Sequence, residues 1–129
     1  MKDVFVDSNI LIRFITRDVE EQYQKSRSFF ESIEEREVNA LVSILVVNEV
    51  VWILEKFYKI KRKIFLPQLI KLLILKNIKI IEVEKELMAK VLEKMIKRKQ
   101  DFTDIYLSQI AKKDELFSFD QDFEKLYKN

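Results

Sequence analysis

Four short apolar runs, separated by longer segments with helical patterning, constrain the fold of this chain more than any other feature. The runs occupy residues 4–6, 40–42, 78–83 and 116–119. The first run does not alternate between polar and apolar residues, which is typical of a strand buried on both faces. Strands separated by helices favour a parallel sheet with right-handed crossovers and helices on both faces. We therefore expect an α/β fold with a central parallel sheet of four to five short strands flanked by helices.

Capping patterns predict where the helices between these runs begin. Asp18 and Glu21 form a capping-type pair that predicts a helix to about residue 35. Ser43 predicts the start of a long helix to about residue 59, and the next helix opens at Phe65 or Pro67 and runs to residue 75. Further helical segments are expected at residues 9–14, 85–97, 102–113 and 122–127.

Length and composition predict one domain over residues 1–129. The 129 residues, of which 48% are hydrophobic and 36% charged, are enough for one core and too few for two. The longest apolar stretch, residues 41–54, is interrupted by Ser43, Asn48 and Glu49, and a membrane span needs roughly 20 apolar residues. Because the chain also lacks cysteine and a leader-like stretch, we expect a cytoplasmic protein without membrane contact.

Two absent residue types restrict the chemistry. The chain has no histidine, which removes the usual general acid or base near neutral pH and the histidine-based nucleophilic pairs. It has no glycine, which removes the glycine-rich phosphate loops. Carboxylates with a bound metal ion are the main candidates that remain if the chain is an enzyme.

Two aspartates stand directly after apolar runs. Asp7 follows the first run and Asp120 follows the last. In open parallel sheets, ligands bind outside the carboxyl ends of the strands, so both aspartates occupy positions where a site is expected. The alternative for Asp7 is a structural role, in which its side chain caps the following helix.

Two further acids lie in predicted helices. Glu49 belongs to a stretch that is apolar nearly all round, so we expect it to be buried and therefore paired, protonated or bound to metal. No lysine or arginine occurs between residues 40 and 55, although a distant basic partner remains an alternative. Asp104 lies in the first turn of its helix with Asp101 at the cap, and a helix N-terminus favours acids for structural reasons alone.

Taken together, these acids predict a metal site. Asp7 and Asp120 end strands, while Glu49 and Asp104 lie in the first turns of helices, so all four can converge on one edge of the sheet. Carboxylates gathered in one pocket repel one another unless cations neutralise them. An oxygen-only ligand set without histidine or cysteine fits Mg²⁺ or Mn²⁺.

Four short motifs occur along the chain, at Val4 to Leu11, Val47 to Leu54, Asp101 to Ile105 and Ser118 to Phe123. They resemble the motifs of PIN domains, in the same order and spacing over nearly the whole chain. The resemblance is closest to the VapC toxins of toxin–antitoxin pairs, and it implies a Mg²⁺- or Mn²⁺-dependent endoribonuclease that forms a homodimer and is neutralised by a small VapB-type antitoxin. The chain departs from the pattern at Ser118, where threonine is more common, at Ile105, where alanine is, and in lacking a clear fifth strand.

The resemblance also implies roles for individual residues. We expect Asp7 and Asp104 to hold the principal metal, and Glu49 and Asp120 to complete its shell or a second site. The metal would activate a water molecule for attack on phosphorus. The residues expected to orient or surround these carboxylates are Asn9, Ser118, Asp101 and Asp122.

Basic residues bunch locally although the net charge is only +2. Arg13 and Arg17, near the end of the first strand, are candidate contacts to RNA phosphates. One cluster comprises Lys61, Arg62 and Lys63 among its members, and a second occupies residues 94–99. Such clusters can carry phosphate contacts, and the alternative is that they are solvated helix ends.

Three other functions are alternatives for a chain with these acids. A PIN nuclease of RNA maturation differs from a toxin only in its partners and substrate. A receiver or phosphatase pocket is disfavoured because haloacid-type phosphatases carry Asp-x-Asp where this chain has Asp7, Ser8 and Asn9. A catalytically silent PIN-like binding module would tolerate loss of the acids, and all four are present.

Overall fold

The computed structural model of the chain, which describes residues 1–35 and 37–128, contains a parallel three-stranded sheet. The strands are β1 (Lys2–Phe5), β2 (Val38–Val42) and β3 (Ile78–Ile80), in the order β1-β2-β3. The register aligns Val4 with Ala40, and Ala40 with Ile78. The predicted α/β class and parallel sheet are confirmed.

Helices connect and follow the strands. Between β1 and β2 lie α1 (Ser8–Thr16) and α2 (Glu20–Glu34). Between β2 and β3 lie α3 (Ile44–Trp52), its π-helical continuation η1 (Ile53–Phe57) and α4 (Arg62–Leu73). After β3 come α5 (Lys85–Ile96), α6 (Phe102–Ile110), the 3-10 turn η2 (Lys113–Glu115) and α7 (Phe123–Leu126). None of the described helices is both long and apolar enough to cross a bilayer.

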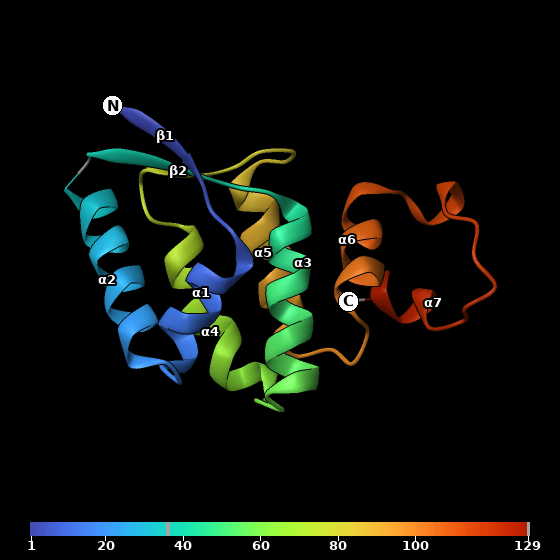
Figure 1. Ribbon diagram of the computed structural model, residues 1–129. Helices are drawn as coiled ribbons and strands as arrows, with labels where there is room; N and C mark the ends of the chain where they lie inside the picture. The colour runs from blue at the N-terminus through green and yellow to red at the C-terminus, as the bar shows by residue number, and fades with distance from the viewer. Residues whose placement is uncertain (36, 129) are drawn as a thin grey trace.

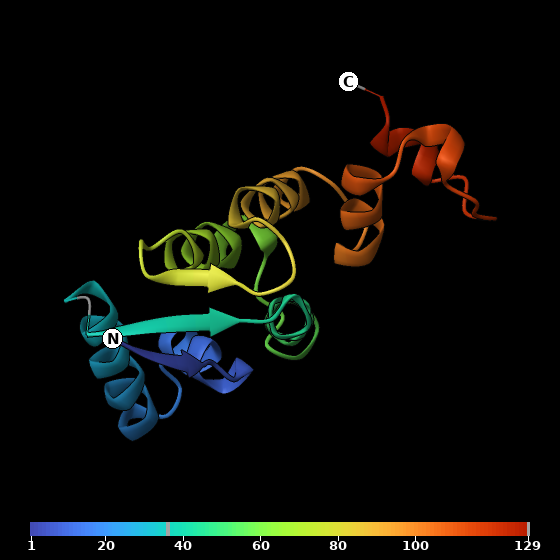
Figure 2. The same ribbon diagram turned by 90° about the horizontal axis from the view of Figure 1, so that it is seen from above.

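The helices α1 to α5 lie on one side of the sheet (Figure 1), and the strands lie in front of them when the molecule is seen from above (Figure 2). The expectation that helices flank both faces is therefore wrong for the described residues. The order β1-β2-β3 explains this for α1 to α4, because two right-handed crossovers that step in the same direction pass over the same face. On the opposite face, the side chain of Phe5 is 72% exposed.

The core lies between the sheet and these helices. Ala40, Ile78 and Ile80 point from the sheet into it and are almost fully buried. The helices contribute side chains that are completely buried, and the largest of them include Phe65, Leu11, Leu54, Met88, Leu92, Met95 and Ile105.

The expected fourth strand at residues 116–119 is not formed among the described residues. The segment is unpaired and lies beyond α6, on the far side of α3 from β1 (Figure 1). Its Phe117 and Phe119 side chains are 87% and 94% exposed. The helix predicted to reach residue 113 ends at Ile110, and the Tyr127 hydroxyl donates to the Ala111 carbonyl oxygen at 2.7 Å. This contact closes residues 111–127 into a loop that keeps the segment away from the sheet.

Two helix starts also differ from the prediction. The N-cap of α2 is Val19, and the Asp18 carboxylate instead accepts hydrogen bonds from the Tyr58 hydroxyl at 2.6 Å and from Thr16. Helix α4 begins at Arg62 rather than at Phe65 or Pro67, so Pro67 lies inside the helix, where its ring nitrogen cannot donate. Ser43 caps α3 as predicted, accepting from the Leu45 N–H at 3.1 Å.

Two corners of the backbone have a left-handed conformation at residues other than glycine. Arg17, at the end of α1, has a φ of 51°, and Lys59, after η1, has a φ of 56°. Glycine usually takes such positions because a Cβ atom is strained there, and this chain contains none.

Candidate metal and nucleic-acid site

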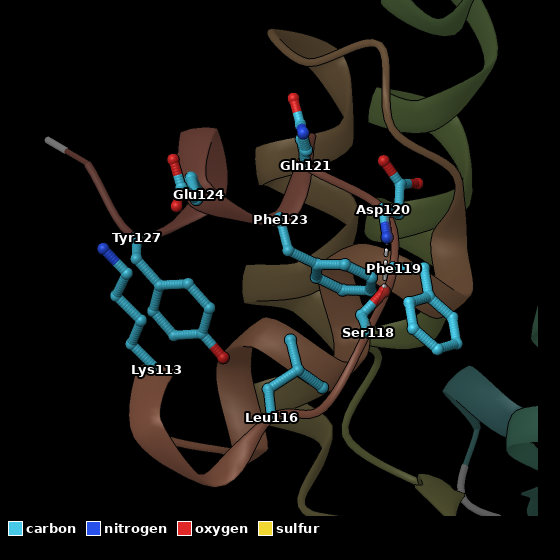
Figure 3. A pocket seen from close by; sticks show the side chains of 9 residues that line it. All are labelled: Lys113, Leu116, Ser118, Phe119, Asp120, Gln121, Phe123, Glu124 and Tyr127. Carbon is cyan, nitrogen blue, oxygen red and sulfur yellow. Dashed lines mark hydrogen bonds between the residues drawn. The ribbon is translucent and has the colours of Figure 1, made fainter.

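Four acids lie together in the C-terminal part of the chain. Asp101 is the N-cap of α6, and its carboxylate accepts the backbone N–H of Asp104 at 3.1 Å. Asp120 accepts the backbone N–H of Asp122 at 2.9 Å, and the Asp120 N–H donates to the Ser118 hydroxyl at 3.0 Å (Figure 3). Ser118 therefore supports the backbone of Asp120 rather than its carboxylate. We call Asp101, Asp104, Asp120 and Asp122 the C-terminal acid cluster.

The electrostatics of Asp104 indicate that these acids act on one another. Burial raises the pKa of the Asp104 carboxyl above its usual value, and the negative charges of Asp101, Asp120 and Asp122 raise it further. A carboxyl group in such surroundings is stabilised in its charged form when a cation binds nearby. The surroundings of Asp104 therefore favour a bound cation.

Asp7 lies elsewhere, directly after β1 at the start of α1. Its carboxylate caps the helix and accepts the Ser8 N–H at 2.8 Å, which is the structural role considered as the alternative. The side chain is exposed, as is that of Asn9 in the first turn of the helix. Asp7 does not contribute to the raised pKa of Asp104.

Glu49 is exposed on α3, so the expectation that it is buried is wrong. Helix α3 buries Val47, Val50 and Val51 against the core and turns its other side outward. On this outer side Leu45 is 74% and Trp52 61% exposed. The apolar composition of the helix therefore reflects an uncovered surface beside Glu49, and the carboxylate has no burial cost to offset.

The acids of the body and those of the C-terminal part do not meet. No group of three acids among residues 1–35 and 37–128 lies close enough to share a metal ion. Their carboxylate oxygens are the donors that Mg²⁺ and Mn²⁺ prefer. The donor set is thus of the right chemical type, but this single chain does not assemble it, and the predicted convergence of Asp7, Glu49, Asp104 and Asp120 is not seen.

The predicted phosphate contacts near the first strand are occupied by protein partners. Arg13 pairs with Asp18 at 3.2 Å and donates to Tyr58 at 2.8 Å. Arg17 pairs with Glu20 at 2.9 Å, and its guanidinium carbon lies 4.2 Å from the centre of the Tyr23 ring. Arg17 also follows the last turn of α1, about 15 Å along the helix axis from Asp7.

Arg62 has a structural role as well. Its guanidinium pairs with Glu55 and donates to the carbonyl oxygens of Met95, Arg98 and Gln100, and its side chain is only 12% exposed. These bonds fasten the link between α5 and α6 to the body of the molecule. The neighbouring Lys61 and Lys63 are exposed, and their contact with RNA stays a prediction.

A cavity of about 510 Å³ joins basic residues to the C-terminal acid cluster. The Oε1 atom of Gln100, a residue that lines this cavity, is buried without a hydrogen-bond partner among the described residues. Gln100 and Lys125 were not expected from the sequence, because Gln100 belongs to none of its motifs and Lys125 comes to the cavity from α7. The residues that line the cavity are Lys97, Arg98, Lys99, Gln100, Asp101, Asp104, Asp122 and Lys125.

The three-stranded parallel sheet and its helices define an α/β domain, and comparison with known families places that domain more closely. The family model described as PIN domain matches residues 4–129. The chain belongs to the PIN domain family, whose members are generally nucleases that typically use divalent metals. No curated protein and no solved structure matched the chain.

Proposed function

We propose that this protein is a Mg²⁺- or Mn²⁺-dependent endoribonuclease that hydrolyses RNA phosphodiester bonds. The observation that carries the proposal is the environment of Asp104, a half-buried acid beside three others in a chain of the PIN family. Like charges held together in a folded protein call for a hard cation. In this proposal Asp7, Glu49, Asp104 and Asp120 are the metal ligands and catalytic residues, supported by Asn9, Ser118, Asp101 and Asp122.

The cavity beside Asp104 supports a nucleic-acid substrate. Lys97, Lys99 and Lys125 stand around the same cavity as Asp101 and Asp104. Cations that flank an acidic metal site can neutralise the phosphates on either side of a scissile bond. We infer that these lysines position the RNA backbone over the acids, and that Arg62, which is occupied, does not.

The partners follow from the resemblance to VapC toxins. We propose that the protein is the toxin of a toxin–antitoxin pair, that it is cytoplasmic, that it forms a homodimer and that a VapB-type antitoxin neutralises it. An antitoxin-like reading frame immediately upstream of the gene would support this role. A PIN nuclease of RNA maturation would lack such a neighbour and would leave cell growth unaffected when expressed alone.

A catalytically silent PIN-like binding module is the second candidate. The separation of the acids in the single chain favours it, because no three of those described share an ion. Such a module would bind RNA through the lysines of the cavity without cleaving it.

An RNA cleavage assay of the purified chain, separated from any co-purifying protein, tests the proposal. Cleavage is expected with Mg²⁺ or Mn²⁺ and is expected to vanish with chelator. An Asp104→Asn protein prepared in parallel controls for contaminating ribonuclease. Cleavage that persists in chelator would overturn the metal-dependent mechanism, and RNA binding without cleavage would favour the silent module.

A further inference from the structure

The outer edge of β1 is open. The Val6 N–H donates to the Leu41 carbonyl oxygen of β2 at 2.9 Å, so by the alternation of a strand the backbone groups of Asp3 and Phe5 point away from the sheet. No backbone hydrogen bond within the described part of the chain reaches these groups. The Phe5 side chain, 72% exposed, lies on the uncovered face beside them. An edge of this kind is a template for a further strand.

The opposite edge of the sheet is partly covered by a side chain. At β3, the Lys85 ammonium group donates to the carbonyl oxygens of Ile78 at 3.0 Å and of Leu75 at 2.7 Å. A charged side chain over the backbone is one of the ways in which proteins block an edge strand. No side chain of the described residues donates to the backbone of β1 in this way, so the β1 edge is the more open of the two.

The chain also carries a strand-like segment without a sheet. Residues 116–118 belong to no helix or strand, Leu116 is extended with φ −98° and ψ 121°, and Phe119 lies at a bend. Phe117 and Phe119 are the two most exposed of the large apolar side chains described. Two aromatic side chains left in water are costly for a small domain. The segment lacks a strand to pair with, and the edge of β1 has unpaired backbone groups that such a segment could bind.

Contacts within the chain keep this segment from its own β1. The Tyr127 hydroxyl donates to the Ala111 carbonyl oxygen, Arg98 donates to the Lys125 carbonyl oxygen, and Leu126 is 5% exposed. The segment would have to break these contacts to cross α3 and reach β1. A second copy of the chain can meet the projecting segment without breaking any of them.

We propose that two copies of the chain exchange residues 116–119, each segment joining the edge of β1 in the other copy as a fourth parallel strand. Such a contact has two-fold symmetry, because each copy gives its segment to the other. Both segments are therefore paired in the dimer. Because Asp7 and Asp120 each follow their strand directly, parallel pairing brings both to the same carboxyl edge. Each metal site then takes Asp7 from one copy and the C-terminal acid cluster from the other.

The register that aligns the two aspartates also satisfies the apolar side chains. With Asp7 opposite Asp120, Phe5 lies opposite Ser118, and the alternation places Phe117 and Phe119 on the face of Val4 and Val6. That face is the one the helices cover, since Val6 is 6% exposed. The exchange thus removes both phenylalanines from water and assembles acids that a single chain keeps apart. The role given to the shared site rests on the proposed nuclease function, whereas the exchange itself does not.

Disulfide cross-linking tests the exchange independently of activity, because the chain has no cysteine of its own. The variant with Phe5→Cys and Ser118→Cys is expected to form a covalent dimer on mild oxidation. Both positions are exposed, so the fold should tolerate the changes. The matched control combines Ser118→Cys with Lys79→Cys, which is exposed on β3, and should give no covalent dimer. A disulfide within one chain, a dimer in the control as well, or no disulfide at all would overturn the exchange.

Two further measurements complete the test. Light scattering of the unmodified chain should give twice the 15.6 kDa of one copy, and a monomer would overturn the exchange. If the site is shared, equal mixing of inactive Asp7→Asn and Asp120→Asn chains should restore about a quarter of the unmodified activity, because half of the dimers have one intact site. An inactive mixture beside an active unmodified dimer would refute the shared site. An inactive unmodified dimer that still cross-links would refute the nuclease function and leave the exchange intact.

Discussion

The Asp101 carboxylate accepts a hydrogen bond from the backbone N–H of Asp104 at 3.1 Å. This bond gives Asp101 a capping role and leaves the Asp104 carboxylate available for a metal ion. Asp101 is committed to capping α6 and is exposed. Asp104 is half-buried and has a carboxyl group whose pKa is raised by burial and by its acidic neighbours.

Substitution should separate the two roles. Asp104→Asn is expected to abolish metal-dependent RNA cleavage with little loss of folding stability, because an amide keeps the shape but not the charge. Asp101→Asn, which retains a capping side chain, should keep measurable activity, whereas Asp101→Ala should lower the free energy of unfolding by about 1 kcal/mol. Cleavage rates and urea unfolding check both. An inactive Asp101→Asn beside an active Asp104→Asn would reverse the assignment.

The stability of the chain in chelator should depend on pH through Asp104. Because the folded pKa of this carboxyl is raised, the folded state binds its proton more tightly than the unfolded state, and stability is lost as pH rises from the unfolded value near 3.8 through the folded pKa. Asp104→Asn removes this loss, so its stability relative to the unmodified chain should increase over that pH interval. Urea unfolding at several pH values in this interval measures the difference in free energy of unfolding between the two proteins. A difference that does not change with pH would contradict the raised pKa.

Glu49→Gln should leave stability almost unchanged while abolishing cleavage. The side chain is exposed, and substitutions at such positions usually change the free energy of unfolding by less than about 0.5 kcal/mol. Thermal melts in chelator and a cleavage assay with Mg²⁺ are the measurements. Strong destabilisation would mean that Glu49 has a structural partner, and full activity would remove it from the site.

Arg62→Ala should be strongly destabilising, by about 3 kcal/mol, because it leaves Glu55 without its partner and three carbonyl oxygens without their donor. Lys63→Ala is the matched control from the same basic cluster, since Lys63 is exposed and should be nearly neutral. Urea unfolding compares the two. If Arg62→Ala instead weakened RNA binding at unchanged stability, the guanidinium would be a substrate contact.

Local patterns predicted the elements that depend on local interactions. The helix at residues 85–97 forms as α5 to within one residue, and Ser43 and Asp101 cap the helices that follow them. The side-chain oxygen of a cap and the N–H groups that it satisfies are neighbours in sequence, so a short stretch carries the whole signal. The predicted strands at residues 40–42 and 78–83 also correspond to β2 and β3.

Features that depend on a distant partner were predicted poorly. Residues 116–119 have a strand pattern, but a strand needs an edge to pair with, and no local pattern reports where the chain carries the segment. Glu49 was expected to be buried because its helix is apolar all round. The helix is covered on one side only, which leaves Leu45 and Trp52 in water. Burial depends on what packs against a helix, and composition alone does not specify that.

The corners at Arg17 and Lys59 show what it means for this chain to fold without glycine. A left-handed backbone costs a residue with a Cβ atom roughly 1–2 kcal/mol, and the fold bears this strain at both places. In return, every residue that turns the chain has fewer conformations available before folding than glycine would have. The unfolded ensemble of this protein is therefore unusually narrow for its length. Each turn residue that is not glycine therefore gains less backbone entropy on unfolding than glycine would gain at the same place.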